Sequence, residues 1–244
     1  MGFCRIRKPN DNERPANLLT TEISTESLSR LTGAGKAIAG WEIASVVVSC
    51  LIAEWVVLSL GGTFRWLIVV PALMAVGLMI LSHRERRETL SDLGFRLDNF
   101  YAAARLLLLP TLAAIVAILI GGWLLSDSRF IVRPLGVRHL SLPVWVLFQQ
   151  YALQGFINRR AQIAWGKGPL SIVTIGVLFS LLHFPNPLLS VLTLIGGVLW
   201  AYVYQRQPNL LALALSHMVV SLSLALTFPK GLIDSLRVGF KYFA

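Results

Sequence analysis

Apolar residues dominate the chain after a polar beginning, and they gather into seven segments. These segments lie near residues 43–60, 66–82, 101–125, 143–158, 170–184, 187–204 and 209–227. Segments of this length and composition predict helices that cross a bilayer, for which about 20 apolar residues are needed. The fourth and fifth are the shortest and most polar, so we expect them to pack against protein rather than lipid. The pattern predicts an all-α, polytopic integral membrane protein with about seven transmembrane helices.

The segments divide the chain into four parts. Residues 1–40 are predicted to be a polar, loosely ordered N-terminal tail. Residues 41–127 hold the first three transmembrane helices and a basic loop, and residues 140–227 hold the remaining four helices. Residues 228–244 are predicted to be an interfacial amphipathic tail rather than another span.

Composition and charge agree with this prediction. The chain has 244 residues, of which 55% are hydrophobic and 14% charged, and its formal net charge is +10. The Lys and Arg residues lie between the apolar segments and not on one basic face, which argues against nucleic acid as a partner. With a cytoplasmic N-terminus, the inner segments carry 14 of them and the outer segments 7. The positive-inside rule therefore predicts that the N-terminus is cytoplasmic.

A polar stripe interrupts the fourth apolar segment, in the sequence FQQYALQGFINRR at residues 148–160. Residues four apart share a helix face, so Gln150, Gln154 and Asn158 form one stripe with Gln149 at its edge. Taken alone, such a stripe is most simply explained as a set of hydrogen bonds between helices.

Two histidines in later segments give the stripe possible partners. His183 ends the fifth segment, and His217 lies within the seventh with Ser221 one turn later. A single histidine in an apolar helix is usually a packing residue. Two of them, together with the amides, are most economically explained by one buried site, because each polar group in a bilayer needs a partner.

Order and spacing of these residues resemble the three motifs of the CAAX protease and bacteriocin-processing (CPBP or Abi) family, which are Glu-Glu-x3-Arg, Phe-x3-His and His-x3-Asn. The matching residues are Gln149, Gln150 and Gln154, then Phe179 and His183, then His217 and Ser221. The resemblance implies a CPBP-like four-helix core over residues 140–227 and intramembrane endopeptidase activity. It also implies a bacterial inner membrane, since DLGFRLDNF resembles bacterial members.

Three substitutions change the chemistry that the resemblance implies. In the family the first Glu and the histidines are thought to activate water, whereas Gln149 has no basic lone pair and cannot take a proton. Gln150 and Gln154 replace the second Glu and the Arg together, which keeps the site neutral. No Asp or Glu occurs from residue 128 to 233. Two histidines without a carboxylate or a cysteine are too few ligands for a typical metal site. We therefore expect no metal and no cofactor.

Other groups could still supply a base or a nucleophile. Glu54, in the first segment, is expected at about the same depth as Gln149, about 9 Å from the outer side. An acid inside a membrane is a functional candidate, although a protonated packing residue is the simpler explanation. A histidine could also activate water or one of the hydroxyl groups nearby, on Ser180, Ser216 or Ser221.

Three classes of function follow. The first is a catalytically altered homologue that binds a membrane peptide or a lipid-modified protein segment, with membrane lipid around it. The second is an active endopeptidase that uses His183 and His217 with Gln149 or Glu54. The third is a transporter, for which the many small residues and the glycine pairs at 61–62, 121–122 and 196–197 are the only support.

Overall fold

The computed structural model describes residues 16–60, 62–125, 136–137, 140–228, 233 and 236–243. Within these ranges the regular structure is entirely helical. The elements are α1 (Ala16–Leu51), η1 (Ile52–Val57), η2 (Gly62–Ile68), α2 (Val69–Glu85), α3 (Leu90–Leu93), α4 (Phe100–Leu124), α5 (Leu142–Gln150), η4 (Tyr151–Asn158), α6 (Arg159–Trp165), α7 (Pro169–Leu181), α8 (Pro187–Arg206), α9 (Leu210–Thr227) and η6 (Gly239–Tyr242). The prediction of an all-α fold is confirmed.

The N-terminal part differs from its prediction. Residues 1–15 lie outside the described part of the chain, but α1 begins at Ala16 and continues without a break to Leu51. The predicted tail of residues 1–40 is therefore helical from residue 16. The sequence allows this because no proline, which would break a helix, occurs between residues 16 and 70. The apolar part of this helix, Thr32–Val57, is a candidate membrane span that begins earlier than predicted.

Among the described residues, five helices are long and apolar enough to cross a membrane: Thr32–Val57, Trp66–Glu85, Phe100–Leu124, Pro187–Arg206 and Leu210–Thr227. They correspond to five of the seven predicted segments. The fourth segment forms the continuous rod α5–η4–α6, and the fifth forms the shorter apolar helix α7. These two are the segments that were predicted to pack against protein. The prediction of a polytopic membrane protein is confirmed. The predicted number of seven spanning helices is not confirmed, because five of the described helices meet the length and hydropathy that a span needs.

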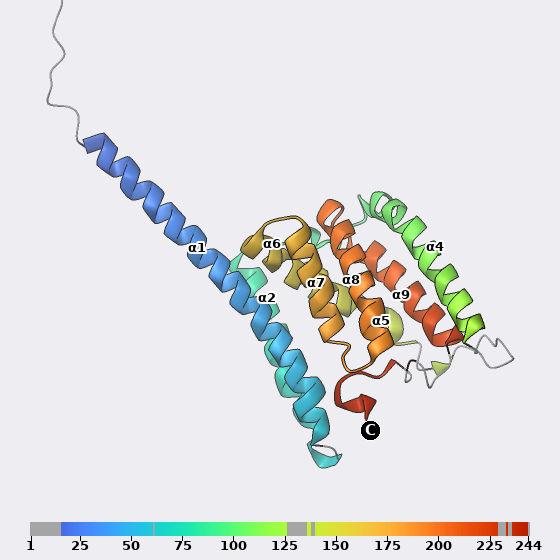
Figure 1. The fold of residues 1–244 in the computed structure, drawn as a ribbon. Helices are drawn as coiled ribbons and strands as arrows, with labels where there is room; N and C mark the ends of the chain where they lie inside the picture. The colour runs from blue at the N-terminus through green and yellow to red at the C-terminus, as the bar shows by residue number, and fades with distance from the viewer. Residues whose placement is uncertain are drawn as a thin grey trace, which may run out of the picture.

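The helices form a bundle with α1 and α2 at one side (Figure 1). Helix α1 packs along α2 and α6, α4 along α9, and α7 along α8. Close approach of α7 and α8 depends on glycine, because a Cβ on Gly197 would lie 2.9 Å from the Cα of Gly176. The second glycine of the pair at 121–122 lies against Thr227 of α9. These glycines thus serve helix packing, which weakens the only support for a transporter; the pair at 61–62 includes a residue outside the described ranges.

Candidate functional site

The amide stripe lies inside the bundle. Gln150, Gln154 and Asn158 are each 0% exposed, whereas Gln149 is only partly buried. The Nδ2 group of Asn158 donates to Oε1 of Gln154 over 2.7 Å, and its Oδ1 accepts from Gln205 over 3.0 Å. Gln154 and Asn158 lie in η4, a π-helical stretch within the rod. Widened turns of this kind occur frequently at functional sites.

Gln150 connects the stripe to a histidine of another helix. Its Nε2 lies 3.2 Å from Nδ1 of His217 in α9, and both residues are buried. Because an amide nitrogen can only donate, Nδ1 is the acceptor in this arrangement and the imidazole carries its proton on Nε2. The other amide atom, Oε1 of Gln150, is buried without a hydrogen-bond partner among the described residues. The site therefore holds an unused acceptor beside a neutral histidine.

His183 is linked to His217 by the ring of Phe179, which contacts both imidazoles. Nδ1 of His183 lies 2.7 Å from the backbone oxygen of Phe179, one turn earlier. The ring of Phe179 meets the imidazole of His183 edge-on at 4.6 Å and that of His217 at 5.8 Å between ring centres. The structure thus brings Gln150, His183 and His217 together: Gln150 and His217 share a hydrogen bond, and the ring of Phe179 contacts both histidines.

Trp200 is a neighbour of this site that the sequence did not reveal. Its ring lies 4.3 Å from that of His217, and its indole N–H donates to Oγ of Ser216 over 3.2 Å. Ser216 also shares a 2.7 Å hydrogen bond with Thr111 of α4. A tryptophan inside a membrane needs an acceptor for its N–H, so Trp200 was the signal for this contact. The hydroxyl of Ser216 is thereby engaged, and Ser180 and Ser221 are half-buried.

Glu54 is close to the His183 turn but not hydrogen-bonded to either histidine in the structure. It lies in η1, a second π-helical stretch, and its Oε2 is buried without a hydrogen-bond partner among the described residues. The next residue, Trp55, stacks on Phe184 at 6.2 Å between ring centres. The Glu54 carboxylate therefore belongs to the residue next to Trp55, and Trp55 contacts Phe184 in the turn that carries His183.

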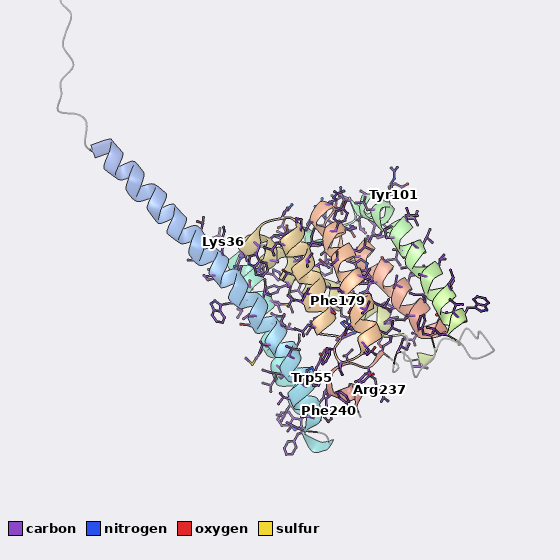
Figure 2. The ribbon with its side chains drawn as sticks, viewed as in Figure 1. Lys36, Trp55, Tyr101, Phe179, Arg237 and Phe240 are labelled. Atoms are coloured by element: carbon purple, nitrogen blue, oxygen red, sulfur yellow. The ribbon has the colours of Figure 1, made fainter. Side chains whose placement is uncertain are left out.

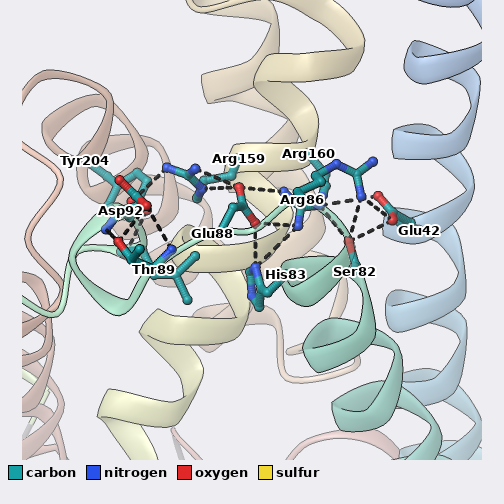
Figure 3. A network of polar contacts seen from close by, with 11 residues as sticks. Glu42, Ser82, His83, Arg86, Glu88, Thr89, Asp92, Arg159, Arg160 and Tyr204 are labelled. Atoms are coloured by element: carbon teal, nitrogen blue, oxygen red, sulfur yellow. Dashed lines mark hydrogen bonds and ion pairs between the residues drawn. The ribbon is translucent and has the colours of Figure 1, made fainter.

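A larger polar network lies away from these histidines, around Glu88 (Figure 3). Oε1 of Glu88 accepts from Arg159 over 2.6 Å, and its Oε2 accepts from Arg160 over 2.7 Å and from Nδ1 of His83 over 2.6 Å. Burial by itself would raise the pKa of Glu88, but the hydrogen bonds from His83, Arg160 and Arg159 outweigh it and hold the pKa well below its usual range.

From the sequence, Arg159 and Arg160 were expected only to orient the protein in the membrane. Arg160 is 0% exposed, and its Nε also lies 3.3 Å from Glu42 of α1. Two adjacent arginines directly after a buried polar stripe point to different sides of a helix, which was a signal that one of them could face the protein. The network ties α1, α2 and α6 together, and within it Nε2 of His83 is buried without a hydrogen-bond partner among the described residues.

The central site is therefore electrically neutral. Amides and imidazoles line it, no described carboxylate bonds to His183 or His217, and no group of three or more potential metal ligands occurs among the described residues. Such an arrangement can donate and accept hydrogen bonds, but it lacks the strong base that water activation ordinarily needs.

Comparison with known proteins supports the resemblance drawn from the motifs. Residues 141–223 match the family described as Rce1-like, type II CAAX prenyl endopeptidase Rce1-like. The matched region contains the amide stripe, His183, His217 and Ser221. The searches of curated proteins and of solved structures found no match to the chain.

Proposed function

We propose that this CAAX-protease-like membrane protein binds a membrane peptide or a lipid-modified protein segment without cleaving it. The contact between Gln150 and His217 carries this proposal. The family pattern has a carboxylate at that position, and an amide there keeps the histidine neutral. A neutral site favours binding of uncharged backbone groups over activation of water.

The unused polar atoms support a binding role. Oε1 of Gln150 and Nε2 of Gln154 are both buried without a hydrogen-bond partner among the described residues. Buried polar groups left without partners cost about 1–3 kcal/mol each. A peptide backbone offers both a donor and an acceptor, so a bound segment could satisfy an amide oxygen and an amide nitrogen at once.

Active cleavage is the alternative that Glu54 supports. If Glu54 supplied the base, the carboxylate missing from the first motif would come from the first span, with His183 and His217 as its partners. The buried, unpartnered Oε2 of Glu54 is the observation in favour of this alternative.

The test compares wild type with Glu54→Gln, His183→Ala and His217→Ala in a host that contains the partner. Each variant carries an affinity tag, and both the bound partner and the sizes of membrane proteins are measured. We expect a partner to co-purify with wild type and Glu54→Gln, and with an exposed-residue control, Lys167→Ala, while the size pattern stays the same in every strain.

Processing in wild type that disappears with a histidine change, while the partner still co-purifies, would contradict the proposal. Loss of a true general base lowers a rate by about 10²–10⁴-fold. Processing that disappears with Glu54→Gln as well would identify the first-span carboxylate as the base.

A further inference from the structure

A short segment near the C-terminus lies across the end of the bundle that holds His183. We call residues 236–243 the strap; it includes η6 and packs on η1 of the first span. Figure 1 shows it between the lower end of α1 and the turn that joins α7 to α8. The same turn carries His183.

Main-chain atoms hold the strap to this turn. The N–H of Gly239 donates over 3.0 Å to the backbone oxygen of Phe184, which is the residue after His183. Asn186, which is 0% exposed, donates through Nδ2 to the backbone oxygens of Ile233 over 2.9 Å and Arg237 over 3.4 Å. The same Asn186 accepts from the N–H of Leu189 and so caps α8. We call the surface that the strap contacts, formed by the His183 turn and η1, the seat of the strap. These hydrogen bonds of the seat are made to backbone groups and not to particular side chains.

Gly239 sets how closely the strap approaches the first span. Its φ is +56°, which favours glycine. A Cβ at this position would lie 2.8 Å from the Cβ of Glu54 and 2.9 Å from its backbone oxygen. Only a residue without a side chain fits between the strap and the π-helical turn of η1.

Aromatic side chains close the edge of this contact. Trp55 stacks on Phe184 at 6.2 Å and lies 6.3 Å from Phe243 of the strap. Figure 2 shows Trp55 and Phe240 at the same end of the molecule, with Phe179 deeper in the bundle. The strap thus covers Glu54 and the His183 turn together.

We propose that the strap occupies the end of the peptide-binding site that the His183 turn and η1 form, and that a partner segment enters there by displacing the strap. This inference rests on the proposed function and specifies its ligand. The seat offers a backbone oxygen at Phe184, the Asn186 amide and a surface at Glu54 that admits only glycine. The favoured ligand is a peptide that turns as the strap does, with glycine at the Gly239 position and aromatic residues after it.

The test measures whether a thiol at position 54 is covered. Glu54→Cys is made in a chain with Cys4→Ser and Cys50→Ser, so that it is the only cysteine, and it keeps the Cβ that contacts Gly239. Maleimide labelling of the purified protein is compared with and without Gly239→Val. We expect Gly239→Val to raise the labelling rate about tenfold or more by forcing the strap off. Gly77→Val, at a glycine with no atom within 4 Å of its Cβ position, should leave it unchanged.

A second variant protects the test against misfolding of Gly239→Val. A chain with Glu54→Cys that ends at residue 235 lacks the strap, and its thiol should be labelled as fast as in the Gly239→Val variant. Adding the peptide LRVGFKYF, the strap sequence, should restore protection, whereas the same peptide with valine for glycine should not. Equal labelling of the parent and both variants would overturn the inference, as would protection by both peptides. Because labelling needs neither a partner nor cleavage, its outcome is separate from that of the proposed function.

Discussion

Gln150 stands where the family pattern has its second Glu, and it is the amide of the stripe that meets a histidine. It is completely buried and bonded to His217, whereas Gln149 is only partly buried. The motif spacing placed both glutamines at the site, yet it could not tell which of two adjacent side chains reaches the histidine. That choice depends on the rotation of the rod against α9, which packing decides.

A residue-scale prediction follows from this difference in burial. Gln150→Glu should lower the free energy of unfolding more than Gln149→Glu, because an ionised carboxylate without a buried partner costs several kcal/mol. Adding Gln154→Arg and Gln149→Glu to Gln150→Glu should recover part of the loss by supplying a countercharge. Thermal unfolding in detergent measures all three. Equal stability of the two single variants would contradict the account of Gln150.

Helix contacts, at the scale of elements, depend on single glycines. Gly197→Ala should destabilise the protein by about 1–3 kcal/mol, because its Cβ would press on the backbone of Gly176 in α7. The matched control is Gly77→Ala in α2, where a Cβ meets nothing within 4 Å. Alanine is there the better helix former by about 0.5–1 kcal/mol, so the control should be neutral or stabilising. The difference in unfolding midpoints checks this, and a Gly197→Ala variant as stable as its control would disprove it.

The sequence was a better guide to the existence of elements than to their inner geometry. Apolar runs predicted all seven helical segments, because hydrocarbon leaves the backbone few alternatives to helix. The sequence could not predict the two π-helical stretches, Ile52–Val57 and Tyr151–Asn158. Each is so short that its wider turns leave no recognisable change in the spacing of apolar residues. The helix over residues 16–40 was also missed, because a polar composition does not by itself exclude helix.

At the scale of the whole molecule, the network around Glu88 joins three helices, α1, α2 and α6. Glu88 bonds to His83 of α2 and to the two arginines of α6, and Arg160 also contacts Glu42 of α1, so two carboxylates connect the three helices. The sequence could not predict this meeting, because the residues lie as much as 118 positions apart and only the packing of α1 on α6 brings them together. The charge count described their number but not their partners.

Acid should weaken this junction. Because the pKa of Glu88 is lowered in the folded protein, its contribution to stability is present above its ordinary pKa of 4.5 and is lost as the pH falls below that value. The unfolding midpoint of the wild type should thus show no loss from this group between pH 7 and 5, and should fall below pH 4.5. Glu88→Gln should be less stable already at pH 7, by about 1.5–3 kcal/mol, because the buried Arg160 loses its charged hydrogen bonds to Glu88 and keeps, of its two carboxylate partners, only the longer contact with Glu42.

The shape of the pH curve separates this network from general acid effects. Glu88→Gln should lose less stability than wild type between pH 4.5 and 3, because it no longer has the carboxylate to protonate. Asp98→Asn is the matched control, since the pKa of Asp98 is also lowered, by its hydrogen bond with Arg96, but the pair lies at the surface. Surface pairs contribute little to stability, so this variant should follow the wild-type curve. An acid slope in Glu88→Gln as steep as in wild type would show that other carboxylates hold the three helices together.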